Sequence, residues 1–231
     1  MRFSSDDYLL FIGMDPAIVG DYFGICVHAL PRKIPENQKT WRPLLINLMT
    51  LKKGNYSSTW DSLTNGVLSK YQGFKVINID YTNEKTLADF LEEKYGERRI
   101  KKTPFTKGES GTKMQMAKSA KKLLDNGYNF PDHTKIDNPV ERDNIRTLKQ
   151  QIINEQILLN PDGSIKFEHK GKHNDLLHAW MLSLDITIQY MTNKLGGDGV
   201  HVGGPIKKKQ QPFIFERVKL DKRGMSASDY R

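Results

Sequence analysis

The sequence has little cysteine and no long apolar segment. Its one cysteine, Cys26, has no second thiol in the 231-residue chain with which to form a disulfide, and its place in an apolar stretch predicts a small core residue. No apolar run approaches the roughly 20 residues that a membrane-spanning helix needs. The acidic pair Asp6 and Asp7 is unlike the basic flank of a signal peptide. We therefore expect a protein of a reducing compartment that has no membrane partner.

The sequence also lacks the phosphate-binding loop of nucleotide-hydrolysing enzymes. Its nearest approach, GESGTK at Gly108–Lys113, has neither the four-residue spacing between glycines nor the Gly-Lys-Ser/Thr ending that the pattern requires. We expect no ATP site in this chain. A zinc site is disfavoured as well, because no cysteine pair accompanies His169, His173 and His178, and the neighbouring Asp175 suits a harder ion.

Positive charge, in contrast, is abundant. The chain has 36 Lys and Arg residues against 27 Asp and Glu, a formal net charge of +9, which favours a polyanionic partner, although a solvated basic surface is the alternative. With 37% hydrophobic residues the chain can bury one sizeable core, so we expect one domain over residues 1–195. The glycine-rich, basic segment 196–231 differs in composition and is expected to form a mobile tail.

Two carboxylates are placed where predicted strands end. The apolar run Tyr8–Met14 predicts a strand that ends before Asp15, and Tyr22–Leu30 predicts a second strand that completes a hairpin. The β-branched stretch Phe74–Ile79 predicts a further strand, and Asp80 follows it. Each acid is either a turn residue or a catalytic group on a rigid scaffold, because Asp is disfavoured within strands but common just beyond them.

A third carboxylate, Asp175, lies in the first turn of a long predicted helix. A helix-favouring acid near the positive end of the helix dipole is the simpler interpretation of this residue alone. Two acids that end strands and one that opens a late helix are, however, the arrangement of RNase H-like nucleases, in which the acids converge on divalent metal. Hard cations such as Mg²⁺ take oxygen ligands and keep several waters, so a few carboxylates suffice. Two such ions can activate a water and stabilise the leaving oxygen at a phosphodiester.

The remaining pattern predicts a fold that suits this site. Trp41–Lys52 predicts a third strand, and Ser57–Tyr71 predicts a helix that crosses over to the strand before Asp80. Three antiparallel strands, a crossover helix and a further parallel strand give an α/β fold with an RNase H-like mixed sheet flanked by helices. Further helices are predicted over Lys85–Tyr95, Met114–Asn126 and Asn138–Glu155, and a small hairpin over 157–169.

Three stretches, in this order and spacing, resemble the nuclease domain of viral large terminase subunits, the DNA-packaging motors of tailed phages and related viruses. They are GMDPAIVGDYFGICV at 13–27, KMQMAKSAKKLLDNGYNFP at Lys113–Pro131, and HNDLLHAW at His173–Trp180. The last is similar to the family's closing His-Asp-Asp-x-x-Asp-Ala motif. Asn174 and His178 depart from that motif, so the resemblance leaves the third metal ligand in place and implies no accessory acid at these two positions.

The resemblance implies an activity, cofactors and partners. It implies that Asp15, Asp80 and Asp175 bind two divalent ions, Mg²⁺ or Mn²⁺, in an endonuclease that cleaves double-stranded DNA during viral genome packaging. In that family a separate ATPase domain powers packaging. That ATPase domain, a small terminase subunit and a portal are therefore the expected partners. The expected location is the cytoplasm of the host cell, and secretion is not expected.

Other residues are candidates for supporting roles. Asp21 begins the second strand of the hairpin and is either a turn residue or an additional carboxylate for a second metal. His173 is a candidate to orient a ligand, a phosphate or an attacking water beside Asp175. The segment Arg98–Lys113 is either a cationic loop that contacts DNA phosphates or an exposed linker. Its basic residues are Arg98, Arg99, Lys101, Lys102, Lys107 and Lys113.

Two other functions are open for this sequence. The first is another RNase H-like nuclease, such as a junction resolvase or a transposase-type enzyme, which would prefer branched to linear DNA. The second is a non-catalytic module that keeps the fold and binds DNA or docks on a capsid. Such a module would bind DNA without metal-dependent cleavage.

Overall fold

The computed structural model describes residues 7–16, 22–33, 43–52, 56–82, 84–106, 111–125, 128, 130–159, 165–169 and 174–195. Among these residues, no helix is long and apolar enough to cross a membrane. The segment 196–231 lies outside them, so the mobile tail stays a prediction.

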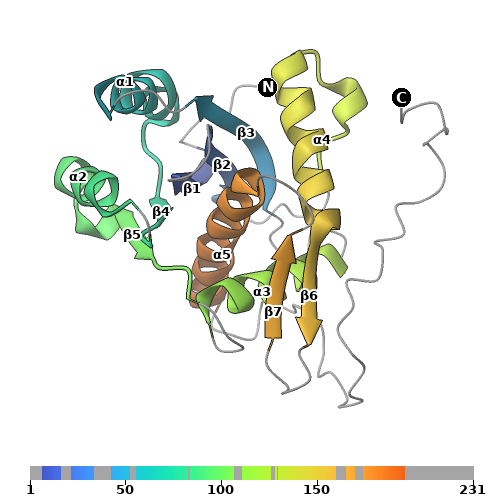
Figure 1. Ribbon diagram of the computed structural model, residues 1–231. Helices are drawn as coiled ribbons and strands as arrows, with labels where there is room; N and C mark the ends of the chain where they lie inside the picture. The colour runs from blue at the N-terminus through green and yellow to red at the C-terminus, as the bar shows by residue number, and fades with distance from the viewer. Residues whose placement is uncertain are drawn as a thin grey trace.

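The centre of the fold is a five-stranded mixed sheet (Figure 1). β1 pairs with β2 and β2 with β3 in antiparallel fashion, whereas β4 pairs with β1 and β5 with β4 in parallel. The strand order is β3-β2-β1-β4-β5, which confirms the predicted hairpin, third strand and parallel crossover. The strands are β1 (Tyr8–Pro16), β2 (Tyr22–Pro31), β3 (Leu44–Lys52), β4 (Val76–Asp80) and β5 (Ile100–Thr103).

Helices cover both faces of this sheet (Figure 1). One face is covered by α2 and by α1 with its continuations η1 and η2, and the other by α3, α4 and α5. A hairpin of β6 and β7 separates α4 from α5 in the sequence. The bounds are α1 (Tyr56–Asp61), η1 (Ser62–Val67), η2 (Leu68–Tyr71), α2 (Lys85–Tyr95), η3 (Glu97–Arg99), α3 (Thr112–Asp125), η4 (His133–Lys135), α4 (Pro139–Asn154), β6 (Glu155–Leu159), β7 (Ile165–His169) and α5 (Asp175–Leu195).

The predicted helix over Ser57–Tyr71 is confirmed as a continuous helical segment, but its helix type changes along its length. The segment starts as an α-helix, widens to a π-helix and then tightens to a 3-10 helix. Thr64 Oγ1 donates to the carbonyl oxygen of Trp60 at 3.0 Å, and Asn65 and Gly66 follow. A side-chain bond to the preceding turn and a glycine both weaken an α-helix. The segment still makes the crossover to β4, so the topology is unaffected.

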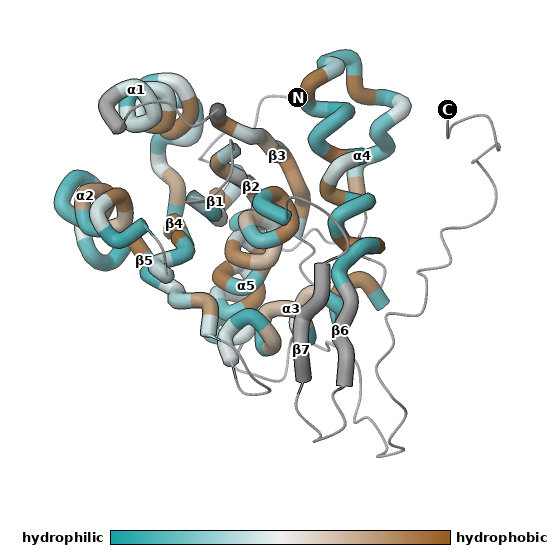
Figure 2. Tube along the Cα trace, viewed as in Figure 1, coloured by the Kyte–Doolittle hydropathy of each residue, from teal (hydrophilic) through white to brown (hydrophobic). Residues whose placement is uncertain are grey.

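The alternation of side chains along the strands defines which residues face α5. Met14 of β1 and Ile79 of β4 pack in the core that includes residues of α2, whereas Phe11 of β1 packs against residues of α5. Successive side chains of a strand point to opposite faces, so Asp15 and Asp80 both lie on the α5 face. Hydrophobic residues run along the strands and α5, and α2 and α4 carry more hydrophilic turns (Figure 2).

The helix α5 lies directly on the sheet at Gly13. A Cβ atom at this position would lie 2.0 Å from the carbonyl oxygen of Ala179 and 2.3 Å from the backbone nitrogen of Ser183. Both distances are inside hard contact, so no larger residue fits without displacing the helix. Glycine is required here by the close approach of two backbones rather than by a turn.

A buried chain of hydrogen bonds also ties α5 to the sheet. Ser183 Oγ donates to the carbonyl oxygen of Phe11 at 3.0 Å and lies 2.8 Å from His28 Nδ1. His28 Nε2 lies 2.6 Å from the hydroxyl oxygen of Tyr128, which accepts from Trp180 Nε1 at 3.2 Å. All donors and acceptors are matched when His28 is neutral and carries its proton on Nδ1. Burial lowers the pKa of His28 to about 3, in agreement with that neutral state.

The depressed pKa of His28 predicts a stability that is lost in acid. The unfolded chain binds a proton at His28 below about pH 6.5, whereas the folded protein binds it only near pH 3, so stability falls as the pH falls through this window. When the unfolded chain binds one proton more than the folded protein, the free energy of unfolding changes by about 1.4 kcal/mol per pH unit. In urea unfolding at pH 4 to 6, His28→Gln should show a shallower slope than the parent. Tyr128→Phe keeps the imidazole and should retain the parent slope; equal slopes for parent and His28→Gln would contradict this role of His28.

Candidate metal centre

Asp15 and Asp80 lie side by side at the carboxyl edge of two parallel strands. Met14 of β1 pairs with Ile79 of β4, and each acid follows directly. Both acids are nearly buried, with 5% and 4% of their surface exposed. The prediction that the first strand ends before Asp15 is wrong, because Asp15 still pairs with Gly24 of β2. The backbone of the sheet therefore fixes both carboxylates.

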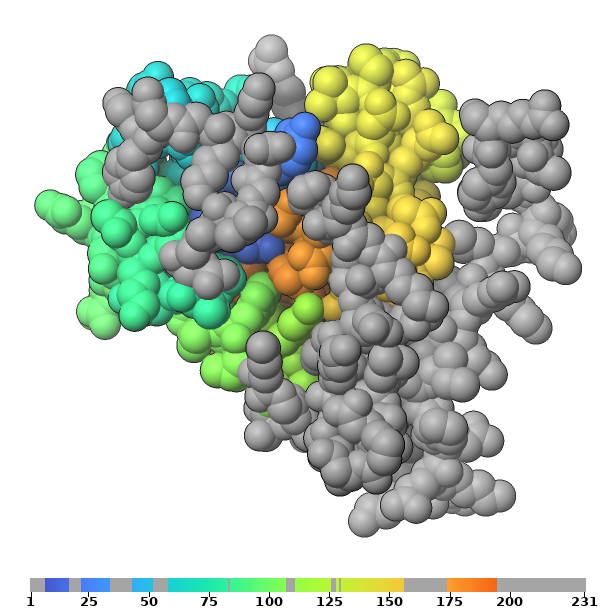
Figure 3. Space-filling view, viewed as in Figure 1, coloured from blue at the N-terminus to red at the C-terminus, as the bar shows by residue number. Residues whose placement is uncertain are grey.

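The third acid, Asp175, is brought to the same edge by α5. The helix begins at this residue, as predicted, and Asp175 is 8% exposed. A Cβ atom at Gly24 would lie 2.3 Å from the carbonyl oxygen of Asp175, so the first turn of α5 rests on β2 at this glycine. Because Gly24 is the register partner of Asp15, the start of α5 lies beside the strand acids. Figure 3 shows β1 in blue and α5 in orange meeting near the centre of the displayed face.

The two strand acids interact electrostatically. Burial raises the pKa of Asp80 above its ordinary value, hydrogen bonds from Thr82 lower it, and the negative charge of Asp15 raises it. A positive charge on His178 would act to lower it. The negative charge of Asp15 therefore disfavours the ionised form of Asp80, and a cation between the two carboxyl groups would relieve this repulsion.

Thr82 holds the Asp80 carboxylate from the loop after β4. Its backbone N–H and its hydroxyl both donate to Asp80 Oδ1, at 2.9 Å and 2.6 Å. The Thr82 hydroxyl oxygen accepts from the backbone N–H of Phe105, just beyond β5, at 2.6 Å. Neither Thr82 nor Phe105 was predicted from the sequence as a supporting residue. The available signal was the Asp-x-Thr spacing, which is typical of a local turn, whereas nothing local indicates the bond to Phe105.

His178 holds the Asp15 carboxylate from α5. Its Nδ1 lies 2.9 Å from Asp15 Oδ2, and its Nε2 lies 3.0 Å from Nδ2 of Asn174. The ring of Phe105 packs against the imidazole, with centroids 4.8 Å apart. In the sequence, Asn174 and His178 stood out only as departures from a motif. Their four-residue spacing, which places two residues on one face of a helix, was the signal of direct contact.

The donor types suit a hard divalent cation, but the described residues do not enclose one as they stand. Within the ranges that the structure covers, no three His, Cys, Asp or Glu side chains converge so that they could hold a metal. Asp15 uses one oxygen to accept from His178. The fold thus places Asp15 and Asp80 together beside the start of α5, and metal binding by Asp15, Asp80 and Asp175 stays a prediction.

The lysines of β5 that were predicted to contact DNA make ion pairs within the chain. Lys101 pairs with Asp185 of α5 at 3.1 Å. Lys102 pairs with Asp89 and Glu92 of α2, both at 2.6 Å. Adjacent residues of a strand point to opposite faces, so the two lysines do not lie together on one surface.

The other described cations of this segment also have local contacts or stand apart. Lys113 pairs with Glu155 at 2.8 Å, and the guanidinium of Arg99 lies 4.0 Å from the centroid of the Phe74 ring. Arg98 is exposed in η3. None of these contacts tests DNA binding, which stays a prediction for this segment.

Three further candidates, Asp21, Lys107 and His173, lie outside the described residues. Asp21 directly precedes β2, and His173 directly precedes Asn174 in the sequence. A metal role for Asp21, an orienting role for His173 and a DNA contact for Lys107 stay predictions.

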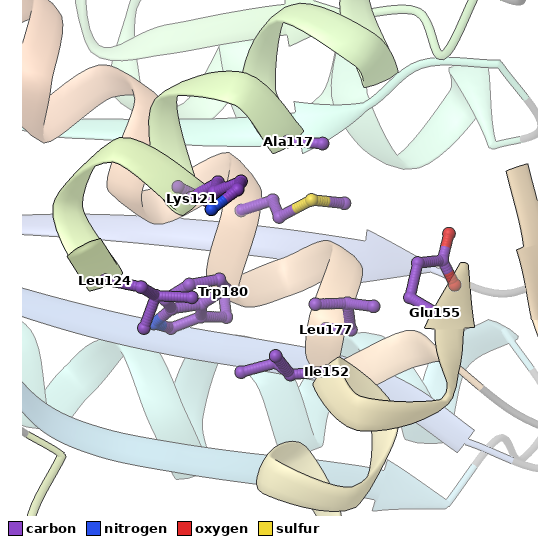
Figure 4. Close-up of a pocket in the computed structure, with 9 residues that line it drawn as sticks. Ala117, Lys121, Leu124, Ile152, Glu155, Leu177 and Trp180 are labelled. Carbon is purple, nitrogen blue, oxygen red and sulfur yellow. The ribbon is translucent and has the colours of Figure 1, made fainter. Parts of the chain in front are cut away.

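A small cavity between α3, α4 and α5 does not include the three acids (Figure 4). Its volume is about 20 Å³, enough for about one water, and its walls are mostly apolar, with Leu124, Ile152 and Trp180 among them. Its one acid, Glu155, is paired with Lys113. The candidate chemistry therefore lies with the strand acids and not with this cavity.

The sheet order, the helices on both faces and the acids at one edge define an RNase H-like α/β fold. Among solved structures, the chain is similar to the large terminase nuclease domain of Thermus phage P74-26, with a TM-score of 0.55 and 16% identity over 79% of this chain and 81% of that one. It is also similar to the large terminase nuclease of thermophilic phage G20c, with a TM-score of 0.52 and 14% identity over 78% and 83% of the two chains. At these identities the likeness establishes the fold. No protein-family model matches the chain, and no curated protein matches its sequence.

The contact at Gly24 predicts that this edge tolerates no added methyl group. Gly24→Ala should displace the first turn of α5 and lower the free energy of unfolding by about 1–3 kcal/mol, the usual cost of overpacking. Urea unfolding followed by circular dichroism measures this change. Gly66→Ala is the matched control, because a Cβ atom there meets nothing within 4 Å. Equal stability of the two variants would show that α5 is not held against Gly24.

Proposed function

We propose that the chain is a metal-dependent endonuclease that cuts double-stranded DNA during viral genome packaging. The observation that carries the proposal is the juxtaposition of Asp15 and Asp80, both nearly buried, beside the helix start at Asp175. The fold around them is similar to that of large terminase nucleases. Burial and the nearby charge of Asp15 raise the pKa of Asp80, an arrangement that is unfavourable for stability alone and supports a functional role.

In this proposal Asp15, Asp80 and Asp175 hold divalent ions, because carboxylate oxygens are the ligands that Mg²⁺ and Mn²⁺ prefer. Two bound ions would supply activation of a water and stabilisation of the leaving oxygen at a phosphodiester. The contribution of the chain is positional. β1 and β4 fix two carboxylates, Thr82 orients one of them and His178 the other, and such fixed placement accounts for much of the rate in reactions of this kind.

The proposed substrate is bound through its phosphates, so little sequence preference is expected. The proposed partners, on the resemblance to large terminases, are an ATPase domain, a small terminase subunit and a portal in the cytoplasm of a host cell. Hydrolysis of a phosphodiester needs no nucleotide, so cleavage by this chain should be independent of ATP.

Digestion of supercoiled plasmid by the full chain tests the proposal. We expect nicking and linearisation with Mg²⁺ or Mn²⁺, no reaction with Ca²⁺ or chelator, and no effect of ATP. Asp15→Asn, Asp80→Asn and Asp175→Asn should each abolish cleavage. Stability in chelator should be unchanged or raised, because each change removes like-charge repulsion. Asp125→Asn, which alters an acid of α3 that is paired with Lys121 and lies outside this edge, should cut like the parent.

The other outcomes of this experiment separate the alternatives. Cleavage that survives chelation, or full activity in any of the three site variants, contradicts the proposed mechanism. A strong preference for four-way junctions over linear duplex would indicate a resolvase. Tight DNA binding with no cleavage in any metal would indicate a non-catalytic module.

DNA binding by the cationic segment 98–113 predicts a measurable change in salt dependence. Joint replacement of Lys101 and Lys102 by Gln should weaken binding to unrelated duplexes alike. It should also flatten the slope of log K against log salt by about 0.9 for each phosphate that the variant no longer neutralises. Fluorescence anisotropy across a salt series gives this slope. Lys121→Gln, which breaks an ion pair with Asp125 on α3, is the control, and an unaltered slope in the double variant would place the DNA path elsewhere.

A further inference from the structure

We infer that Asn174 and His178 act as a positioning pair that sets the Asp15 carboxylate for metal binding, an inference that rests on the proposed function. Asn174 directly precedes α5, and His178 lies one turn into it. The backbone N–H of His178 donates to the carbonyl oxygen of Asn174 at 3.0 Å, so the helix itself holds the two side chains in register. Neither residue is an acid, and neither supplies a charge of its own when the imidazole is neutral.

The contacts of His178 define which of its ring nitrogens donates a hydrogen bond and which accepts one. An ionised carboxylate only accepts hydrogen bonds, so His178 Nδ1, 2.9 Å from Asp15 Oδ2, carries a proton. His178 Nε2 lies 3.0 Å from the amide nitrogen of Asn174, which only donates, so Nε2 is the acceptor. The imidazole thus links the Asn174 amide to the Asp15 carboxylate, so the orientation of the amide sets that of the carboxylate.

Packing fixes the imidazole in this orientation. Only 13% of the His178 side chain and 7% of the Asp15 side chain are exposed. The ring of Phe105 packs edge-on against the imidazole, at an interplanar angle of 73°. Phe105 also donates its backbone N–H to Thr82, which in turn holds Asp80. One residue therefore contacts the supports of both strand acids.

The hydrogen bond from His178 suits Asp15 as an acid that has to bind a cation, as a comparison with Asp185 shows. Asp185 is held by a lysine, whose positive charge competes with any metal for the carboxylate. Asp15 is held by a ring that can donate a hydrogen bond while neutral. Such a donor restricts rotation of the carboxylate and leaves its negative charge for a metal, as the partners of metal-ligating side chains commonly do.

Calorimetric titration of Mn²⁺ into the full chain, together with the Mn²⁺ dependence of plasmid cleavage, tests this inference. His178→Phe keeps the ring but loses both nitrogens, and it should weaken Mn²⁺ binding by about 10- to 100-fold. Cleavage at saturating Mn²⁺ should fall much less than the affinity. His178→Asn can place an amide nitrogen near the position of Nδ1 and should restore most of the affinity. His133→Phe on η4 is the control and should bind Mn²⁺ like the parent.

The tautomer provides a readout that a merely structural histidine would not change. Nitrogen NMR of labelled imidazoles in chelator should show His178 protonated on Nδ1 alone, and Asn174→Ala should weaken that preference and lower Mn²⁺ affinity without loss of the fold. A His178 ring protonated on Nε2 alone, or unchanged Mn²⁺ affinity in both His178→Phe and Asn174→Ala, would overturn the inference. If His178→Phe does not fold, Asn174→Ala and His178→Asn decide the question.

The outcomes also separate this inference from the proposed function. Cleavage with unchanged metal affinity in the variants overturns the positioning role alone. Mn²⁺ binding that depends on His178, without any cleavage, overturns the nuclease and keeps the positioning role. A parent chain that binds no Mn²⁺ overturns both.

Discussion

The site depends on the direct contact between the backbone of α5 and the backbone of two glycines in the sheet. The helix crosses β1 at Gly13 and β2 at Gly24 so closely that no side chain fits between them. A helix held off by ordinary side chains would carry Asp175 away from the level of the strand acids. Hydrogen bonds that join Ser183 to Phe11 and His28 hold the same helix further along, and none of these groups is charged. Two glycines and one neutral polar chain therefore determine where the third acid lies.

The acids of this fold are stabilised in two different ways. Those outside the candidate site, such as Asp185 and Glu155, are paired with lysines. Asp15 and Asp80 are held instead by His178 and Thr82, which donate hydrogen bonds without a fixed positive charge. Burial of acids without counter-charge is costly, and the apolar packing on both faces of the sheet has to offset that cost. Among the buried acids of the described residues, Glu155 has a lysine partner whereas Asp15 and Asp80 have neutral donors, so the strand acids are the pair at which a cation is most favourable.

Much of the fold could be predicted from the sequence because its signals, such as apolar runs of strand length and a proline at the first position of α4, are local. The same signals placed Asp80 and Asp175 at element ends. They failed at Asp15, because whether a strand continues past an acid depends on its partner across the sheet, here Gly24. The support of Asp80 by Thr82 had a local signal in the Asp-x-Thr spacing, whereas the support of Asp15 could not be predicted, because His178 meets Asp15 across 163 positions of the chain. No local pattern distinguishes a histidine that orients an acid from one that fills a core.

The distribution of charge bears on how such a site would meet DNA. Several cations of the folded part are matched by acids on neighbouring elements, Lys101, Lys102 and Lys113 among them. The segment 196–231 carries eight Lys and Arg residues against four Asp and Glu, so it supplies four of the nine net positive charges in about a sixth of the chain. Net positive charge of this kind attracts a phosphate backbone over roughly a Debye length, about 8–10 Å, without reading its bases. Attraction of this kind, without sequence preference, suits the proposed nuclease, in which the acids at the sheet edge would act on any phosphodiester without selecting a position along the duplex.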